Sequence, residues 1–429
     1  MKPFQLGMIA AFALLALISI TIFATFSGCD SESVGSVTIW GTVSEETMRL
    51  VFNEVRNTHG GFNGVSYEMV PADTLITNLV EAIAAGRGPD LILLPAASIG
   101  SEQDKLLVIP YSEISRRSFQ DSFVEAGEIF LDERGVLGLP FYIDPYVMYW
   151  NRSLFSQAGI PRPVRYWDEF SDVAPLLSQA NESGTLTQSA VALGEWGNVN
   201  HAKDIFLSLI IGLGNPIVQK NQEGEYQVTL TARGEGSELP AASALRFFTE
   251  FADPVQRVYS WNRSLPEARE AFLAGDLAVY LGKASEVTAI RASNPNLNFD
   301  IAPYPEVRGG VVAVPADLYA FSVPRGASNT SGALAAAQIL SNSVAQKALV
   351  SVTGLPSVRR DVLSVSPENP YEATFRDAAL NAYSFRDPNP KLSDDIFKRI
   401  VEGVSSGRFR INEALRSGQE ELEELLGVQ

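Results

Sequence analysis

Two tryptophans and several hydroxyl side chains stand at positions where they could bind a polar, ring-shaped solute. Trp40 ends the first predicted strand, where its indole ring could stack on a flat ligand face. Thr42 and Ser98 follow two predicted strands, and each hydroxyl can donate or accept a hydrogen bond. Trp196 lies in a loop rich in glycine and asparagine, where an exposed tryptophan is costly unless something covers it. These residue types indicate solute binding; the alternative is that the rings simply pack in a core.

Common catalytic and metal-binding motifs are absent from the sequence. It contains no Gly-x-Ser-x-Gly, His-Glu-x-x-His, glycine-rich phosphate loop or Cys/His pair. It has two histidines and one cysteine, which exclude an internal disulfide framework and a cysteine-based zinc site. We therefore expect no metal, no cofactor and no enzymatic activity. A glycoside hydrolase needs only two carboxylates, so with 50 Asp and Glu this alternative stays open.

The length and charge of the chain limit its possible partners. With 429 residues, of which 46% are hydrophobic, it can form two or three domains that each bury a core. It carries 33 Lys and Arg against 50 Asp and Glu, a net charge of −17. No stretch rich in Lys or Arg could locally overcome the repulsion of phosphates. We therefore expect no nucleic-acid partner.

The N-terminal segment, residues 1–28, is predicted to be a signal peptide or a membrane anchor. Its 21 residues 6–26 are nearly all apolar, and that length can cross the hydrocarbon core of a bilayer. The small residues before Cys29 resemble the bacterial lipobox, which implies cleavage before Cys29 and lipid attachment to its thiol. The alternative is an uncleaved helix. Either one, followed by a polar tether at 29–36, places the rest of the chain outside the cytoplasmic membrane, tethered to it.

Strands and helices alternate along the exported part. Strands are predicted at residues 37–40, 65–70 and 90–94, with helices between them, and this order is typical of an α/β fold with a mostly parallel sheet. Ligands on such sheets bind beyond the carboxyl ends of the strands, next to Thr42 and Ser98. A second block of strands and helices follows without a flexible linker, which favours two lobes joined by several backbone crossings.

Several short segments stand in a characteristic order along the chain. They are GLPFYID at 138–144, MYWNRSLF at 148–155, AGI at 158–160, YWDEF at 166–170, AFLAGDLAV at 271–279 and TGLPSVR at 353–359. In this order they resemble the family 1 extracellular solute-binding proteins, which include the maltose-binding protein of ATP-binding-cassette (ABC) importers. The resemblance spans about residues 36–426.

The resemblance implies a two-lobed, periplasmic-binding-protein-like (type II) α/β fold. Each lobe is expected to hold a mostly parallel sheet flanked by helices, and the lobes close over a solute by hinge motion. The implied boundaries are 36–143 plus 316–352 for lobe one and 147–312 plus 356–429 for lobe two, with hinges near 144–145, 314–315 and 354–355.

The resemblance also implies further ligand-binding residues. Asp144 falls at the family's acidic ligand position, and a carboxylate can accept two hydroxyl hydrogen bonds. The other candidates are Asn198 beside Trp196, Tyr280 and Lys283 around a glycine turn, and Tyr319 after the second hinge. Weaker candidates are Asn200, His201, Tyr383, Phe385 and Arg386. The alternatives are that Asp144 satisfies backbone groups of the hinge loop, that the asparagines and His201 cap a helix, and that residues 383–386 pack between the lobes.

The implied function is that of the extracellular component of an ABC importer. A monomer would capture a small polar solute, such as a sugar or oligosaccharide, and deliver it to the permease subunits. The tryptophan that maltodextrin binders carry in the C-terminal helical region has no counterpart at 393–397, so another sugar, a polyol or a glycerol-phosphate compound stays open. A sensor that presents its ligand to a membrane receptor is the alternative.

Overall fold

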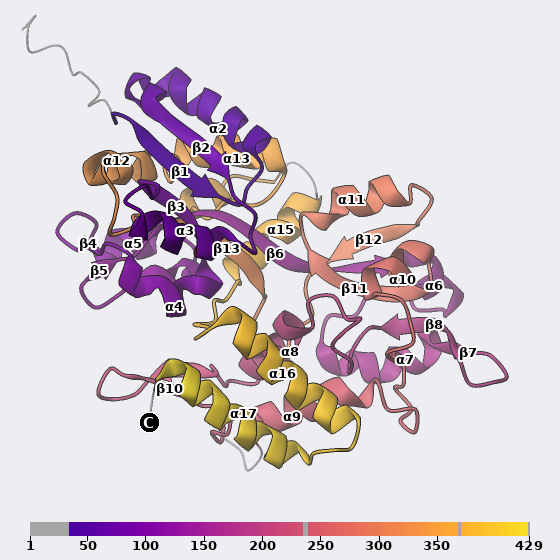
Figure 1. Cartoon of the computed structure of the whole chain (residues 1–429). Coiled ribbons are helices and arrows are strands. Elements are labelled where there is room, and N and C mark those ends of the chain that lie inside the picture. Colours follow the sequence, from indigo (N-terminus) through magenta and orange to yellow (C-terminus); the bar gives the residue numbers. More distant parts are fainter. Residues whose placement is uncertain (1–33, 235–238, 368–369, 428–429) are drawn as a thin grey trace, which may run out of the picture.

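The computed structural model describes residues 34–234, 239–367 and 370–427, which form two lobes side by side (Figure 1). The predicted signal or anchor segment 1–28, Cys29 and most of the tether lie outside the described residues. Within the described residues, we find no helix that is both long enough and apolar enough to span a bilayer.

The strands and helices have the following bounds. The strands are β1 Val37–Gly41, β2 Val65–Met69, β3 Leu91–Pro95, β4 Ile109–Pro110, β5 Gly135–Val136, β6 Leu139–Asn151, β7 Gln179–Ala180, β8 Leu186–Val191, β9 Val218–Lys220, β10 Tyr226–Val228, β11 Leu277–Lys283, β12 Phe299–Ala302 and β13 Ala316–Ser322. The α-helices are α2 Glu45–Thr58, α3 Leu75–Ala84, α4 Ile99–Glu102, α5 Arg116–Ser122, α6 Arg152–Gln157, α7 Phe170–Leu177, α8 Ala202–Gly212, α9 Pro240–Glu250, α10 Ala268–Ala274, α11 Glu286–Ser293, α12 Thr330–Leu340, α13 Ser343–Thr353, α14 Arg360–Leu363, α15 Pro370–Leu380, α16 Pro390–Ser405 and α17 Ile411–Leu426.

The long strand β6 joins the sheets of the two lobes. Its first half pairs with β13, with Asp144 opposite Asp317. Its second half pairs with β11, with Tyr146 opposite Lys283, and also with β12. The strand order is β2-β1-β3-β13-β6-β11-β8-β7, with β12 as a branch on β6. One continuous sheet therefore passes through both lobes at the level of residues 144–145.

The sheet is mixed, which corrects the expectation of a mostly parallel sheet in each lobe. Strands β1, β2 and β3 are parallel, as their connection by helices α2 and α3 predicts. Strand β13, in contrast, is antiparallel to both β3 and β6. The reason is that β6 carries the chain into lobe two and β13 brings it back, so the two crossings run in opposite directions.

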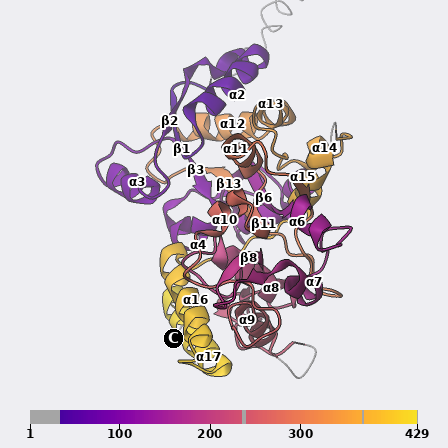
Figure 2. The ribbon, with the colours of Figure 1, turned by 90° about the vertical axis from the view of Figure 1, so that its right-hand side faces the viewer.

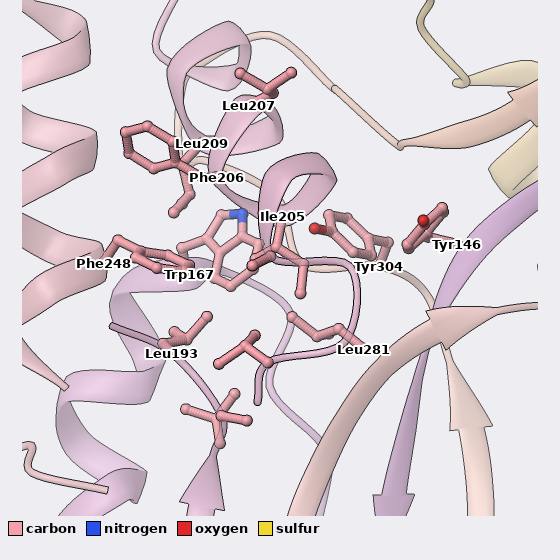
Figure 3. Packing of buried hydrophobic residues seen from close by; sticks show 14 of the residues in the cluster. Tyr146, Trp167, Leu193, Ile205, Phe206, Leu207, Leu209, Phe248, Leu281 and Tyr304 are labelled. Carbon is pink, nitrogen blue, oxygen red and sulfur yellow. The ribbon is translucent and has the colours of Figure 1, made fainter. Parts of the chain in front are cut away.

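Two separate hydrophobic cores support the lobes. The first core is built around the sheet from β2 to the start of β6 and includes Phe62, Phe141 and Phe321. The second contains the fully buried Trp261 and the hydrophobic cluster of Figure 3. Tyr142 of β6 packs against both cores. Because each lobe buries its own apolar surface, a change in the angle between them need not expose a core.

The C-terminal third of the chain is divided between the two cores. Leu355 packs in the second core, whereas Val358 and Leu363, predicted to belong to lobe two, pack in the first. Helix α15 lies over β6 and contributes to both cores. The chain then passes through residues 383–389 to α16 and α17, which pack side by side on lobe two (Figure 2). The predicted lobe boundaries stay a prediction.

Candidate functional site

A cavity of about 780 Å³ lies between the lobes. Lobe one contributes the end of β3 with the turn after it, and the start of β13. Lobe two contributes the loop around Trp196, the first two turns of α8 and the start of α16. The lining residues are Pro95, Ala96, Ala97, Trp196, Val199, His201, Ala202, Lys203, Asp204, Leu207, Pro315, Ala316, Asp317, Leu318, Tyr319, Tyr383, Ser384, Phe385, Asp387, Pro390, Lys391, Asp394 and Asp395.

Two helices begin at the cavity and present their first turns to it. His201 precedes α8 with φ of 62°, a left-handed conformation that turns the chain sharply into the helix. Asn389 caps α16, its side chain accepting a hydrogen bond from the backbone N–H of Leu392. Both turns carry charged residues, whereas most of the remaining residues of α8 are buried and apolar. The charged residues of the cleft are therefore concentrated where the two helices start.

Four aromatic side chains from both lobes line the cavity: Trp196, Tyr319, Tyr383 and Phe385. Trp196 is 7% exposed, and its Nε1 lies 3.5 Å from Oδ2 of Asp394 on α16. Burial raises the pKa of Tyr319 to about 12, and a hydrogen bond with the Thr42 side chain opposes that increase. Aromatic faces next to hydrogen-bonding groups suit a ligand that has both apolar and polar sides.

A buried ion pair fixes the wall on the side of lobe two. Lys203 Nζ of α8 donates to Asp387 Oδ2 at 2.5 Å and to the Ser393 hydroxyl at 2.6 Å. Ser393 also donates to Asp387. The Asp387 side chain is only 2% exposed, so the pair holds the segment before α16 against the start of α8.

Asp204 follows Lys203 by one residue and faces the cavity without a cation at ion-pair distance among the described residues. The Tyr146 hydroxyl donates to Asp204 Oδ2 at 2.8 Å. Burial raises the pKa of the Asp204 carboxyl above its usual value, and the charge of Asp317 raises it further. The site thus holds a carboxylate that is energetically costly to ionise.

A second group of charges lies at the crossing between the lobes. Lys283 Nζ on β11 donates to Asp317 Oδ2 on β13 at 2.6 Å. Burial alone would lower the pKa of Lys283, but the charge of Asp317 raises it above its usual value. Asp144 lies opposite Asp317 on β6, is 4% exposed, and accepts a hydrogen bond from the Ser285 N–H at 3.0 Å. Burial raises the pKa of Asp144 to about 6.

Of the nine ligand-binding residues predicted from sequence, the structure places Trp196 and Tyr319 in the cavity wall. Of the weaker candidates, His201, Tyr383 and Phe385 also line it, whereas Arg386 lines a separate inter-lobe pocket. Thr42, Lys283 and Asp144 are outside the cavity lining but next to residues that form it: Thr42 interacts with Tyr319, Lys283 pairs with Asp317, and Asp144 lies opposite Asp317 on the neighbouring strand. A role for these three residues in binding stays a prediction.

The remaining predicted residues have other partners and lie outside the cavity lining. Trp40 Nε1 donates to Glu68 Oε2 at 2.9 Å, and Tyr280, 2% exposed, donates to Glu286 at 2.8 Å. Asn198 donates to the carbonyls of Asn262 and Leu265 and accepts from Trp261, which ties its loop together. Asn200 accepts a hydrogen bond from the Arg269 backbone N–H. The Ser98 carbonyl accepts from the Ser101 hydroxyl.

Sequence reasoning missed the seven Lys and Asp residues of the cleft: Lys203, Asp204, Asp317, Asp387, Lys391, Asp394 and Asp395. The sequence holds a signal for Lys203 and Asp204: both lie at the start of a predicted helix whose later residues are nearly all apolar. No group of three or more His, Cys, Asp or Glu in the described part of the chain is arranged to hold a metal ion.

The family model described as "Bacterial extracellular solute-binding protein" matches residues 52–375, about three quarters of the chain. The chain therefore belongs to this family. The resemblance seen in the sequence is confirmed, and the matched family is one of solute-binding proteins, which as a class are not enzymes.

Curated relatives match part of this solute-binding protein. A putative binding protein of Brucella abortus (strain 2308), BAB2_0491, is 27% identical over 190 residues, which cover 42% of this chain and 43% of the relative. The galactooligosaccharide-binding protein of Bacillus subtilis (strain 168) is 21% identical over 229 residues, 53% of this chain and 49% of the relative. The chain thus matches these relatives over about half of their length.

Solved structures match nearly the whole solute-binding protein. A cyclo/maltodextrin-binding protein complexed with maltotetraose has a TM-score of 0.71 at 15% identity, covering 91% of this chain and 96% of that one. The cyclic α-maltosyl-1,6-maltose binding protein from Arthrobacter globiformis also has a TM-score of 0.71, at 17% identity, covering 91% and 98%. The predicted two-lobed α/β fold is confirmed.

Proposed function

We propose that this protein captures a saccharide in the cleft between its lobes and delivers it intact to the permease subunits of an ABC importer. The observation that carries the proposal is the lining of the 780 Å³ cavity by aromatic rings and carboxylates from both lobes. A volume in this range is typical of small-molecule sites.

The chemistry of the lining suits a saccharide. The rings of Trp196 and Tyr319 stand on different lobes, so a sugar could contact aromatic surface from both sides. Ionised carboxylates accept only, and a sugar supplies hydroxyl donors in quantity. Several proteins of similar structure were solved with saccharides, including maltotetraose and mannotriose, which supports this solute class.

The two-lobed arrangement explains how capture could be signalled to a membrane partner. A solute that touches both lobes binds the closed arrangement more tightly and shifts the open–closed balance by that difference in affinity. The permease would then recognise the closed form. A sensor would use the same closing motion. Uptake of the solute by a permease distinguishes the importer component from a sensor.

A thermal-shift screen of the purified full chain against sugars and polyols tests the proposal. A solute at about 100 times its Kd should raise the free energy of unfolding by about 2.7 kcal/mol. Recovery of the solute unchanged after long incubation supports binding without catalysis. The proposal fails if no saccharide stabilises the protein, or if a stabilising saccharide is chemically converted.

We further propose that the N-terminal segment tethers the protein to the outer side of the cytoplasmic membrane, through lipid on Cys29 or through an uncleaved helix. The mass of the membrane-bound protein distinguishes the two anchors. Residues 1–28 should be missing and Cys29 should carry lipid if lipid is the anchor, whereas residues 1–28 should be present if the helix is. Release of the unaltered protein by high salt would contradict both.

A further inference from the structure

We propose that the solute carries a positive charge and is a saccharide that bears a protonated amine. This inference rests on the proposed function of the cleft and specifies its substrate class. It comes from the balance of charges on the cavity wall and from which of those charges are already paired.

The cavity wall carries more negative than positive groups. Five of its residues are aspartates, namely Asp204, Asp317, Asp387, Asp394 and Asp395, and two are lysines, Lys203 and Lys391. The whole chain carries a net charge of −17 as well. A cleft of this sign raises the local concentration of cations and repels phosphates and carboxylates. A glycerol-phosphate compound is thereby disfavoured.

Two lysines at the cleft, Lys203 and Lys283, are already paired with aspartates of its wall. Lys203 is held by Asp387 at 2.5 Å and by the Ser393 hydroxyl, with only 15% of its side chain exposed. Lys283, behind the wall, is held by Asp317 at 2.6 Å. Each pair cancels one of the five aspartates, which leaves three aspartates of the wall against one lysine, Lys391, without an ion pair among the described residues.

Three carboxylates face the cavity without such a partner. Asp204 accepts from the Tyr146 hydroxyl at one oxygen, Oδ2, and no described group bonds to its other oxygen, Oδ1. Asp394 has a single long contact, 3.5 Å from Trp196 Nε1, and Asp395 has no hydrogen bond or ion pair among the described residues. Lys391, on the same helix, is exposed and makes no ion pair with any described residue.

An ammonium group fits these carboxylates better than a hydroxyl does. A hydroxyl gives a carboxylate one neutral hydrogen bond, whereas an ammonium gives up to three charge-assisted bonds and also compensates the charge. The indole of Trp196 adds to this preference, because the face of an aromatic ring attracts a cation. The partly desolvated Asp204 gains most, since a carboxylate without a counter-ion is costly in such a place.

Matched saccharides test the inference with the full chain. We would use isothermal titration with sets of oligosaccharides that share ring number and linkage and carry an amine, an N-acetyl group or a hydroxyl at the same carbon. We expect the amine member to bind roughly 10-fold or more tightly than its neutral counterparts, and this preference to shrink as salt rises.

Two variants locate the effect. Asp204→Asn keeps the shape of the side chain and an oxygen that can accept from Tyr146. It should weaken the binding of the amine-bearing oligosaccharide roughly 10-fold or more and change the binding of its neutral counterparts little. Asp121→Asn removes the same charge from the surface of lobe one, where the side chain is 72% exposed, and should leave both affinities unchanged.

The outcomes separate this inference from the proposed function. Tighter binding of neutral members, or an equal loss of all members in Asp204→Asn, overturns the inference and leaves saccharide capture standing. Binding of amines that are not saccharides, such as polyamines, together with no saccharide binding, overturns both. Absence of binding by every amine member also overturns the inference.

Discussion

The Asp144 carboxyl should make the protein less stable as the pH rises through about 6. It is 4% exposed, lies opposite Asp317, and accepts a hydrogen bond from the backbone N–H of Ser285. Burial raises its pKa from 3.8 to about 6, because the charged form loses its hydration. Since the pKa in the folded state exceeds that in the unfolded state, the protonated carboxyl stabilises the fold below about pH 4. This stabilisation is lost as the pH rises through 6.

The size of the effect follows from the difference between the two pKa values. One pKa unit corresponds to about 1.4 kcal/mol, so the ionised carboxyl lowers the free energy of unfolding by about 3 kcal/mol at pH 8. Asp144→Asn removes the charge and keeps an oxygen that can accept from the Ser285 N–H. The variant should therefore be more stable than the natural protein at pH 8 by up to about 3 kcal/mol, and about equal to it at pH 4.

Urea unfolding at several pH values, followed by tryptophan fluorescence, measures this difference. Asp121→Asn serves as the control, because its exposed carboxyl should change stability little at any pH. The reasoning is refuted if Asp144→Asn is destabilised at pH 8, and more so than at pH 4, since that would mean that the carboxylate stabilises the crossing in its charged form.

Three further predictions concern the cleft. Lys203→Met should lower the free energy of unfolding by about 3–5 kcal/mol, because it leaves the buried Asp387 charge unpaired, and adding Asp387→Asn should recover part of the loss in urea unfolding. Gly100→Ala should cost about 1–3 kcal/mol, because its Cβ would lie 2.1 Å from the Asp387 carbonyl oxygen, whereas Gly60→Ala meets nothing within 4 Å and should be nearly neutral. Trp196→Ala should weaken saccharide binding roughly tenfold in titration, and Trp196→Phe, which keeps an aromatic face, should weaken it less; equal losses would argue against stacking.

Local sequence patterns were sufficient for the fold class and the first lobe. The apolar run of β3 and the amphipathic helices α2 and α3 follow from residue periodicity, because a strand covered on both faces must be apolar throughout. Trp196 could be predicted as a cleft residue from sequence, because a tryptophan between glycines is costly to leave exposed to water. Ordered segments over most of the chain also indicated the family.

The tertiary structure alone decided which polar residues share the cleft. Asp204 and Asp394 are 190 positions apart, and they meet at one cavity only because α8 and α16 begin at the same place. Asp144 and Tyr280 carry suitable side chains, yet strand register turns them toward hydrogen-bond partners within the protein. A sequence specifies which hydrogen bonds a side chain can make, but register and helix packing determine whether its partner is a solute or the protein itself.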